Sequence, residues 1–452
     1  MTRMVMRVRW RRVLTLAGID RAVGWSAAPR VWSILFGPLT VLLITTYLTV
    51  EEQGYYFTFN SIVALQAVFD LGLASVIQQF VSHERAFLEW QPDGTIGGND
   101  LQKHRLASLL RLGLKWYAVT AGLLSAALLI AGTMLFTLRP SSVTGWERPW
   151  IAIALMAGPT LLLAPAFAIL EGCGAVAEVA RARMGQIVAS HLAGWGTLLA
   201  GGRLWSPAAA DAAALIVGLL WIGHQWRHFF ADLIRSTGSE VSWRDEVWPF
   251  QWRTALSWTS NYFLMQVFTP ILFLYAGAAE AGRMGMTLAI VTALSGFSIV
   301  WLATKRPRLA MHVARREFAE FDRLFFPAAV RAILVMLAGC IAFIAGAAIL
   351  SILHHPWRDR LLAQAPLVML TASILMTQIF WSESAYLRAH KQEVLLGARL
   401  TSAALIVASA VALGRCCGAT GMMAGFLVSN TVVAVGWGTL VFLRKRREWH
   451  AS

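Results

Sequence analysis

Apolar runs of about 20 residues recur along the whole chain, separated by shorter polar segments. A run of that length crosses a bilayer as an α-helix, and a helix satisfies its own backbone hydrogen bonds inside hydrocarbon. Twelve such runs are predicted as membrane-spanning helices, at residues 29–49, 55–82, 112–137, 150–170, 184–203, 209–225, 254–275, 284–304, 327–353, 365–387, 394–413 and 421–443. The pattern therefore predicts an all-α integral membrane protein with both termini on one side.

The second run is interrupted by polar side chains at helical spacing. With about 3.6 residues per turn, Gln66 and Asp70 are neighbours on a helix, and Asn60 and Gln78 lie within the same third of its surface. In hydrocarbon each such side chain costs free energy unless it finds a partner or a wet cavity. The sequence therefore predicts one polar strip that faces an interior.

The segment 51–84 also carries a family resemblance. The residues that carry it are Glu52, Gly54, Tyr55, Tyr56, Phe59, Leu65, Leu71, Gly72, Leu73, Gln79, Phe80, His83 and Glu84. They resemble the second transmembrane helix of the oligosaccharide flippases, also called polysaccharide biosynthesis or export proteins, within the superfamily of the multidrug and toxin extruders (MATE-like). Elsewhere only the overall layout is similar.

The resemblance implies a fold and a substrate class. Relatives of this kind move a lipid-linked, polyprenyl-diphosphate oligosaccharide from the inner to the outer leaflet of a bacterial plasma membrane. The partners expected by resemblance are therefore that glycolipid, membrane lipids and polysaccharide-assembly proteins, with no cofactor. The resemblance also implies that the first, second, seventh and eighth helices line the transport cavity.

The two halves of the chain echo each other. Pro38 and Pro270 lie in the middle of the first and seventh runs, and Glu52-Gln53-Gly54 and Glu280-Ala281-Gly282 precede the second and eighth. Six spans per half make such repeats parallel, and transporters built this way bind near the midplane between the halves. The predicted division is a six-helix lobe at 1–225, a cytoplasmic linker at 226–253 and a six-helix lobe at 254–452.

Charge fixes the predicted orientation. The chain is 57% hydrophobic and only 14% charged, with a net charge of +15. In a soluble protein that charge would indicate nucleic acid, but 32 of the 39 Lys and Arg residues fall in alternate connections. Cytoplasmic connections are rich in Lys and Arg, so both termini are predicted to face the cytoplasm, and no nucleic-acid partner is expected.

Polar groups inside the predicted spans are the candidate cavity residues. Thr254, Ser257 and Asn261 share one face of the seventh helix. The cavity candidates are Arg30, Asn60, Gln66, Asp70, Thr254, Ser257, Asn261 and Gln266, and further polar groups in or at the edge of the spans are Glu171, His191, Gln378, Ser382 and Glu383. For the neutral members, hydrogen bonding between helices is the competing interpretation. A buried carboxylate needs a cation, a proton or water, so Asp70 is the candidate for ion coupling.

Arg30 has two interpretations. It lies near the inner end of the first span, eight residues before Pro38. A guanidinium near a helix end reaches the headgroups as an orientation anchor. A guanidinium that points into the cavity would instead hold phosphate oxygens bidentately. The peptidoglycan-precursor flippases, which look like relatives, have several cavity cations, whereas the first span here offers only Arg30.

Other motifs are weaker. His224, His228 and Asp232 lie on one helix face, but an amphipathic interfacial segment explains the spacing, so no metal is expected. Residues 172–177 fit G-x-G-x-x-A without the strand that a dinucleotide loop needs. No G-x-x-x-x-G-K-[ST] motif occurs, so transport would be secondary rather than ATP-driven.

Three alternatives stay open at this point. A multidrug antiporter of the same fold would have an acidic cavity for cationic drugs, whereas a diphosphate needs a basic one. A polysaccharide polymerase or ligase would need large outer loops and an acid–base cluster, and the predicted outer turns are short. A membrane scaffold would not require the polar strip.

Overall fold

The described chain is almost entirely helical, as the apolar runs predict. The computed structural model describes residues 21–450 apart from 140–141, 239–240 and 391–393. It forms two compact units. The first holds Met1–Thr40, Gln66–Leu129 and Glu147–Ala255, and the second holds Val41–Leu65, Ile130–Trp146 and Leu256–Ser452. The lobes predicted at 1–225 and 254–452 stay a prediction.

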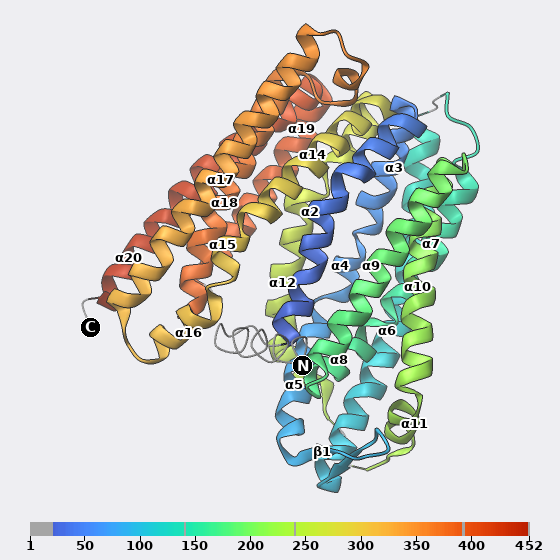
Figure 1. Ribbon diagram of the computed structural model, residues 1–452, viewed down its shortest axis with the longest axis vertical. Helices are drawn as coiled ribbons and strands as arrows, with labels where there is room; N and C mark the ends of the chain where they lie inside the picture. The colour runs from blue at the N-terminus through green and yellow to red at the C-terminus, as the bar shows by residue number, and fades with distance from the viewer. Residues whose placement is uncertain (1–20, 140–141, 239–240, 391–393, 451–452) are drawn as a thin grey trace, which may run out of the picture. The chain divides into compact units, whose positions relative to one another are not determined.

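The first unit contains a closely packed pair of long helices, α9 and α10, side by side in Figure 1. Small residues allow the approach, since Ser206 Oγ donates to Gly194 O at 2.9 Å. The elements with residues in this unit are α2 (Arg21–Tyr47), α4 (Gln66–Asp70), α5 (Leu73–Glu84), η1 (Arg85–Phe87), β1 (Leu88–Trp90), β2 (Ile96–Gly98), α6 (Asp100–Leu138), α7 (Glu147–Leu161), α8 (Ala164–Gly172), α9 (Val176–Leu199), α10 (Trp205–Gln225), α11 (Arg227–Arg235), the π-helix η2 (Trp243–Val247) and α12 (Trp248–Met265).

The second unit joins α3, from early in the chain, to the helices of the C-terminal half. Helices α2, α6 and α12 continue into it from the first unit. Its other elements are α3 (Val50–Val63), α13 (Phe268–Ala276), α14 (Ala278–Ser298), α15 (Val300–Ala303), α16 (Arg306–Ala314), α17 (Phe318–Ile352), η3 (Pro356–Arg360), α18 (Gln364–Ala389), α19 (Leu396–Ser429), the π-helix η4 (Asn430–Trp437) and α20 (Gly438–His450).

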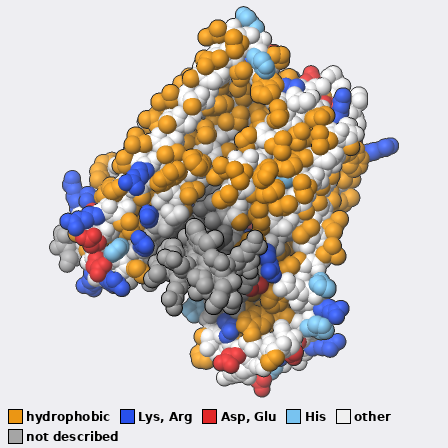
Figure 2. Space-filling model, in the orientation of Figure 1, with side chains coloured by type: hydrophobic (Ala, Val, Ile, Leu, Met, Phe, Trp, Pro, Cys, Tyr) orange, Lys and Arg blue, Asp and Glu red, His pale blue; other side chains and the backbone are white. Residues whose placement is uncertain are grey.

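Helix α17 shows how a helix of this protein divides its surface. Its buried face carries small or flexible side chains such as Ala332 and Met336, whereas Leu334 and Ile341 are exposed. Large apolar side chains on the outside and small ones at helix contacts are typical of membrane proteins, because lipid is as apolar as leucine. Figure 2 shows hydrophobic side chains along the helix flanks, with Lys and Arg gathered near the C-terminal end of α20.

The described helices account for many of the predicted spans. Seven are long and apolar enough to cross a membrane, and the bent pair Val50–Asp70 and Leu73–Phe87 makes an eighth. The last of the seven, Leu396–Trp449, contains the final two predicted runs, which fold back on each other at Gly418 with φ of 56°. A Cβ on Gly425 would lie 2.5 Å from Ser409 Cβ, so the fold-back is close. The chain is thus a multi-pass membrane protein, while twelve spans remain a prediction.

A small module follows α5 in the first unit. Strands β1 and β2 form an antiparallel hairpin in which Leu88 pairs with Gly98 and Trp90 with Ile96. The Trp90 ring lies 5.5 Å from that of Trp226 and 5.3 Å from that of Phe229 in α11. Phe229 and Leu233 are the buried residues of α11, so this amphipathic helix covers the hairpin.

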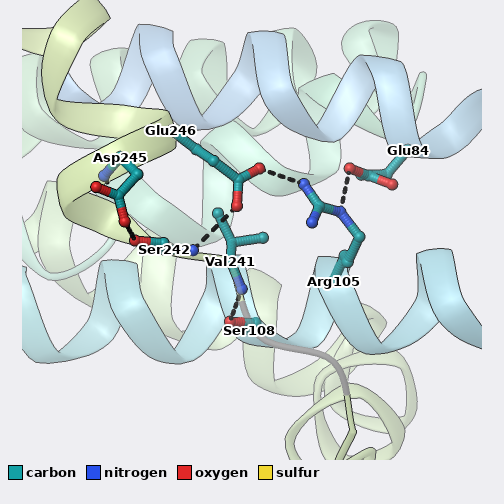
Figure 3. Close-up of polar contacts among 7 residues, drawn as sticks. All are labelled: Glu84, Arg105, Ser108, Val241, Ser242, Asp245 and Glu246. Carbon is teal, nitrogen blue, oxygen red and sulfur yellow. Dashed lines mark hydrogen bonds and ion pairs between the residues drawn. The ribbon is translucent and has the colours of Figure 1, made fainter.

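Polar contacts attach the second part of the predicted linker, which includes Val241 and Glu246, to α6 (Figure 3). Arg105 of α6 donates from Nε to Glu84 Oε1 at 2.8 Å and from Nη2 to Glu246 Oε2 at 2.6 Å. The backbone N–H of Val241 donates to Ser108 Oγ at 3.0 Å. The hydrogen bond from Arg105 holds the pKa of the Glu246 carboxyl below its ordinary value. The linker is therefore bound to α6 by a charged clamp, consisting of Arg105, Glu84 and Glu246.

Candidate functional site

Asp70 lies at a break in the second predicted span. Instead of the one long helix expected, the segment forms α3, α4 and α5, with turns at 64–65 and 71–72. Leu71 and Gly72 both have left-handed backbones, with φ of 48° and 67°. A leucine rarely adopts that conformation, because its Cβ meets the backbone, so the break is locally strained. The pieces Val50–Asp70 and Leu73–Phe87 meet at a bend of 41°.

The Asp70 carboxylate holds this break together. Its side chain is 9% exposed and accepts a hydrogen bond from the Tyr117 hydroxyl of α6. It also accepts from the backbone N–H groups of Gly72 and Ala74 at the start of α5. The first N–H groups of a helix lack partners inside it, so Asp70 caps α5 from the preceding helix. The same carboxylate is an intramembrane ionisable group, which carries either a charge or a proton.

Of the other candidates of the second span, Gln66 shares a helix with Asp70 and Asn60 lies on another. Asn60 is exposed on α3, and its Nδ2 donates to Tyr56 O of its own helix at 3.0 Å. Gln66 is half-buried at the start of α4, in the first unit, whereas Asn60 lies in the second. Gln66 and Asp70 do share the single helix α4. The helix breaks thus interrupt the continuous period on which the strip was predicted.

The candidates on the seventh span lie on α12 and just after it. Thr254 is half-buried, and its hydroxyl donates to Phe250 O at 3.3 Å. Gln266 is half-buried at the junction of α12 and α13. Ser257 and Asn261 lie in α12, but their side chains fall outside the described part of the structure. The common face of Thr254, Ser257 and Asn261 therefore stays a prediction.

Arg30 belongs to α2, and its side chain also falls outside the described part. The backbone places it within a long helix that contains Pro29 and Pro38. Further along this helix, Thr40 Oγ1 accepts a hydrogen bond from Trp195 Nε1 of α9 at 3.0 Å. Both interpretations of Arg30, anchor and phosphate ligand, remain open.

Three polar residues outside the candidate set are held in the interior. Gln53 of α3 is fully buried, Glu383 of α18 is 8% exposed, and Asp211 of α10 is half-buried. Glu383 Oε1 accepts a hydrogen bond from Thr439 Oγ1 at 2.6 Å, whereas no described side chain bonds to Asp211. In the sequence, Asp211 could have been recognised as an acidic residue within an apolar run. Gln53 could have been recognised as an amide beside a glycine.

The histidine-containing face at the end of the sixth span does not gather ligands. Asp232 forms an ion pair with Lys103 at 3.0 Å, and Nε of Arg227 contacts His228 Nε2 at 3.2 Å. Among the described residues no group of three or more His, Cys, Asp or Glu side chains is placed to bind a metal. The acidic side chain of this face is thus occupied by an ion pair.

The helical architecture places the chain in a class of solved structures. The chain has a MATE-like fold, and several solved structures share it over nearly their whole length. An inward-facing multidrug resistance MATE family transporter of that superfamily matches with a TM-score of 0.65 and 15% identity, covering 92% of this chain and 95% of that one. Lipid II flippase MurJ in an inward closed conformation matches with 0.60 and 13%, covering 95% and 91%.

A third solved structure extends the comparison. The MATE multidrug transporter DinF-BH matches with a TM-score of 0.57 and 14% identity, covering 94% of each chain. No protein-family model matches the chain. No curated protein sequence matches it either. At these identities the similarity defines the fold, and the substrate of each relative belongs to that relative.

Proposed function

We propose that the chain is a secondary transporter that flips a lipid-linked oligosaccharide across the bacterial inner membrane. The observation that carries the proposal is the fold, which multidrug MATE transporters share with the lipid II flippase MurJ. The dense resemblance of residues 52–84 to oligosaccharide flippases favours the glycolipid over a drug. The lack of a nucleotide-binding loop in the sequence supports secondary rather than ATP-driven transport.

The physical difficulty is to carry a polar glycan and a diphosphate through hydrocarbon. In the proposed mechanism a wet cleft between two lobes holds the polar head while the polyprenyl tail stays in lipid. Transporters with parallel repeats open such a cleft alternately to each side. Arg30 would hold phosphate oxygens, and Asp70 would change its charge during the cycle.

A deletion experiment in the native host tests the substrate class. Loss of the gene is expected to leave a polyprenyl-diphosphate oligosaccharide accumulating in the inner membrane and to remove the matching glycan from the cell surface. Expression of the full chain should restore the surface glycan, while the Asp70→Asn chain should restore less. An unchanged surface glycan, with no accumulated glycolipid, would overturn the proposal.

The alternative is a small-molecule multidrug antiporter. The specific observation in its favour is the fold match to a multidrug resistance MATE transporter, with the TM-score of 0.65. An antiporter would lower the accumulation of cationic dyes in cells and would raise resistance to them. Dye efflux together with a normal surface glycan would favour the antiporter over the flippase.

A further inference from the structure

Two glycines from opposite halves of the chain touch each other in the second unit. Gly54 lies in α3 and Gly282 lies in α14. A Cβ on Gly282 would lie 2.8 Å from the Gly54 backbone N and 2.8 Å from Val50 O. A Cβ on Gly54 would overlap the carbonyl of Ala278. The two helices are therefore in backbone contact, and no larger residue fits at either glycine.

These glycines occupy equivalent positions in the two halves of the sequence. Gly54 ends the tripeptide Glu52-Gln53-Gly54, and Gly282 ends Glu280-Ala281-Gly282, before the second and eighth predicted spans. When equivalent residues of two repeats touch each other, their contact lies on the axis that relates the repeats, as in an isologous interface. In transporters with parallel repeats this axis runs along the membrane normal, with the substrate site between the repeats. In a transporter of that kind, this contact would lie across one end of the substrate path.

A polar clasp reinforces the glycine contact. The Gln53 amide is fully buried, and its Nε2 donates to Gly282 O at 2.8 Å and to Arg360 O at 3.2 Å. Arg360, in η3 of the second half, donates from Nη1 to Gln53 Oε1 at 3.3 Å. Both ends of one amide are thus paired with the other half of the chain. A buried amide that lost these partners would need water in their place.

Aromatic rings surround the clasp on the side of α13. Tyr55 and Phe136, from the first half, lie 5.0 Å and 5.2 Å from Phe273 of the second half, measured between ring centroids. All three side chains are buried. Parting α3 from α14 would expose glycine backbone, the Gln53 amide and these rings, so opening the contact would cost free energy.

We propose that the contact of Gly54 with Gly282, clasped by Gln53 and Arg360, is the gate that closes the outer end of the substrate path. The assignment rests on the proposed transport function. The Lys and Arg distribution predicts that the turns before Gly54 and Gly282 face outside, so a glycolipid that enters from the cytoplasm leaves only when this contact opens. Within the second unit, the described conformation has this contact closed.

The test joins the two halves reversibly at the clasp. The four native cysteines are first replaced by alanine, and Gln53→Cys is combined with Arg360→Cys. A short bifunctional methanethiosulfonate then bridges the two thiols, and glycolipid flux is measured in vesicles before and after reduction. Flux is expected to fall to the protein-free rate when bridged and to recover with reductant. Full flux in the bridged protein would overturn the gate.

A matched control places a bridge at the same turn, but between two residues of the second half. Arg283 Nε donates to Asp359 O at 2.9 Å, and both residues belong to the second half. Bridging Arg283→Cys to Asp359→Cys should leave flux unchanged, because this bridge does not cross between the halves. Loss of flux in the control as well would assign the effect to rigidity of η3 and would overturn the gate.

A second measurement needs neither the bridge nor flux. Gln53→Cys alone, in the chain whose native cysteines are replaced by alanine, is exposed to a membrane-impermeant maleimide from outside, with and without glycolipid or a membrane potential. A gate predicts slow labelling at rest and faster labelling under turnover. A thiol that stays protected from the maleimide in every condition shows a permanent contact and would contradict the gate. This result is read without measuring glycolipid transport. Gating and the proposed substrate are thus tested separately.

Discussion

At the scale of the residue, Asp70 combines two roles in one side chain. It caps α5 across the strained turn at Leu71 and Gly72, and it accepts a hydrogen bond from Tyr117. A residue with only a capping role tolerates asparagine, since the amide oxygen still accepts hydrogen bonds. A residue that changes charge during transport does not. Substitution of Asp70 therefore distinguishes a structural role from a role in ion coupling.

Asp70→Asn is expected to fold normally and to lower glycolipid flux by about tenfold, which corresponds to about 1.4 kcal/mol in a rate-limiting step. Asp70→Glu, which keeps the charge, should be milder. Tyr117→Phe serves as the control, because it removes one donor from the carboxylate and leaves the charge in place. Flux and thermal unfolding are measured for all three. Normal flux in Asp70→Asn would make the residue purely structural.

Arg30 is expected to need its guanidinium rather than its charge alone. Lysine keeps the charge but cannot make two parallel hydrogen bonds to phosphate oxygens. Arg30→Lys should therefore lower flux by about tenfold, while expression and membrane orientation stay normal. An orientation anchor would accept lysine, so full flux in Arg30→Lys would remove this residue from the substrate site.

The sequence supplied part of the information at this scale. Asp70 could be predicted as important because a carboxylate in an apolar run needs a partner. Its partner could not be predicted, because Tyr117 lies on another helix and hydrogen-bonds to it only in the folded protein. The left-handed Leu71 carries no residue-type signal, since leucine is an ordinary helix former. Only Gly72 marked the position of the turn.

At the scale of the element, the linker is bound to α6 through the clamp of Arg105, Glu84 and Glu246. The Glu246 pKa is lowered in the folded protein, so its contribution to stability is present above the ordinary carboxyl range. That contribution is lost as the pH falls through the lowered pKa. Attachment of the linker should accordingly be complete at neutral pH and weaken in acid.

Glu246→Gln should loosen the linker at neutral pH, because the glutamine amide cannot form the ion pair with Arg105. Limited proteolysis of the linker 226–253 measures this directly, and cleavage should be several-fold faster than in the unsubstituted protein. Glu89→Gln, at an exposed position on β1, is the matched control. Equal cleavage rates in the unsubstituted protein and Glu246→Gln would show that the clamp does not hold the linker.

Helices were predictable where an apolar run was long, and structure was missed where the apolar pattern was interrupted. The apolar runs predicted the helices because length and hydropathy suffice for a span. They predicted neither the breaks at 64–65 and 71–72 nor the hairpin of β1 and β2. The last two runs pack closely where Gly425 meets Ser409, because a glycine leaves room for the neighbouring helix.

At the scale of the whole molecule, the distribution of charge predicts the topology. Because 32 of 39 Lys and Arg residues fall in connections predicted to lie on one side, fusions of a reporter near residues 95, 240 and 315 should all report cytoplasm. Fusions near 142 and 280 should report the outside. Alkaline phosphatase and green fluorescent protein fusions at each site give opposite signals and check each other. An outside signal at 240 would contradict the division into two six-helix lobes.

The measurement that bears most directly on the proposed function uses the purified full chain in proteoliposomes. A polyprenyl-diphosphate oligosaccharide with a labelled glycan is placed in both leaflets, and an impermeant glycosidase is added outside. The flippase predicts that the protein exposes the inner pool far faster than protein-free vesicles do, and that unlabelled glycolipid competes while a cationic dye does not. Exposure at the protein-free rate, together with transport of the dye, would contradict it.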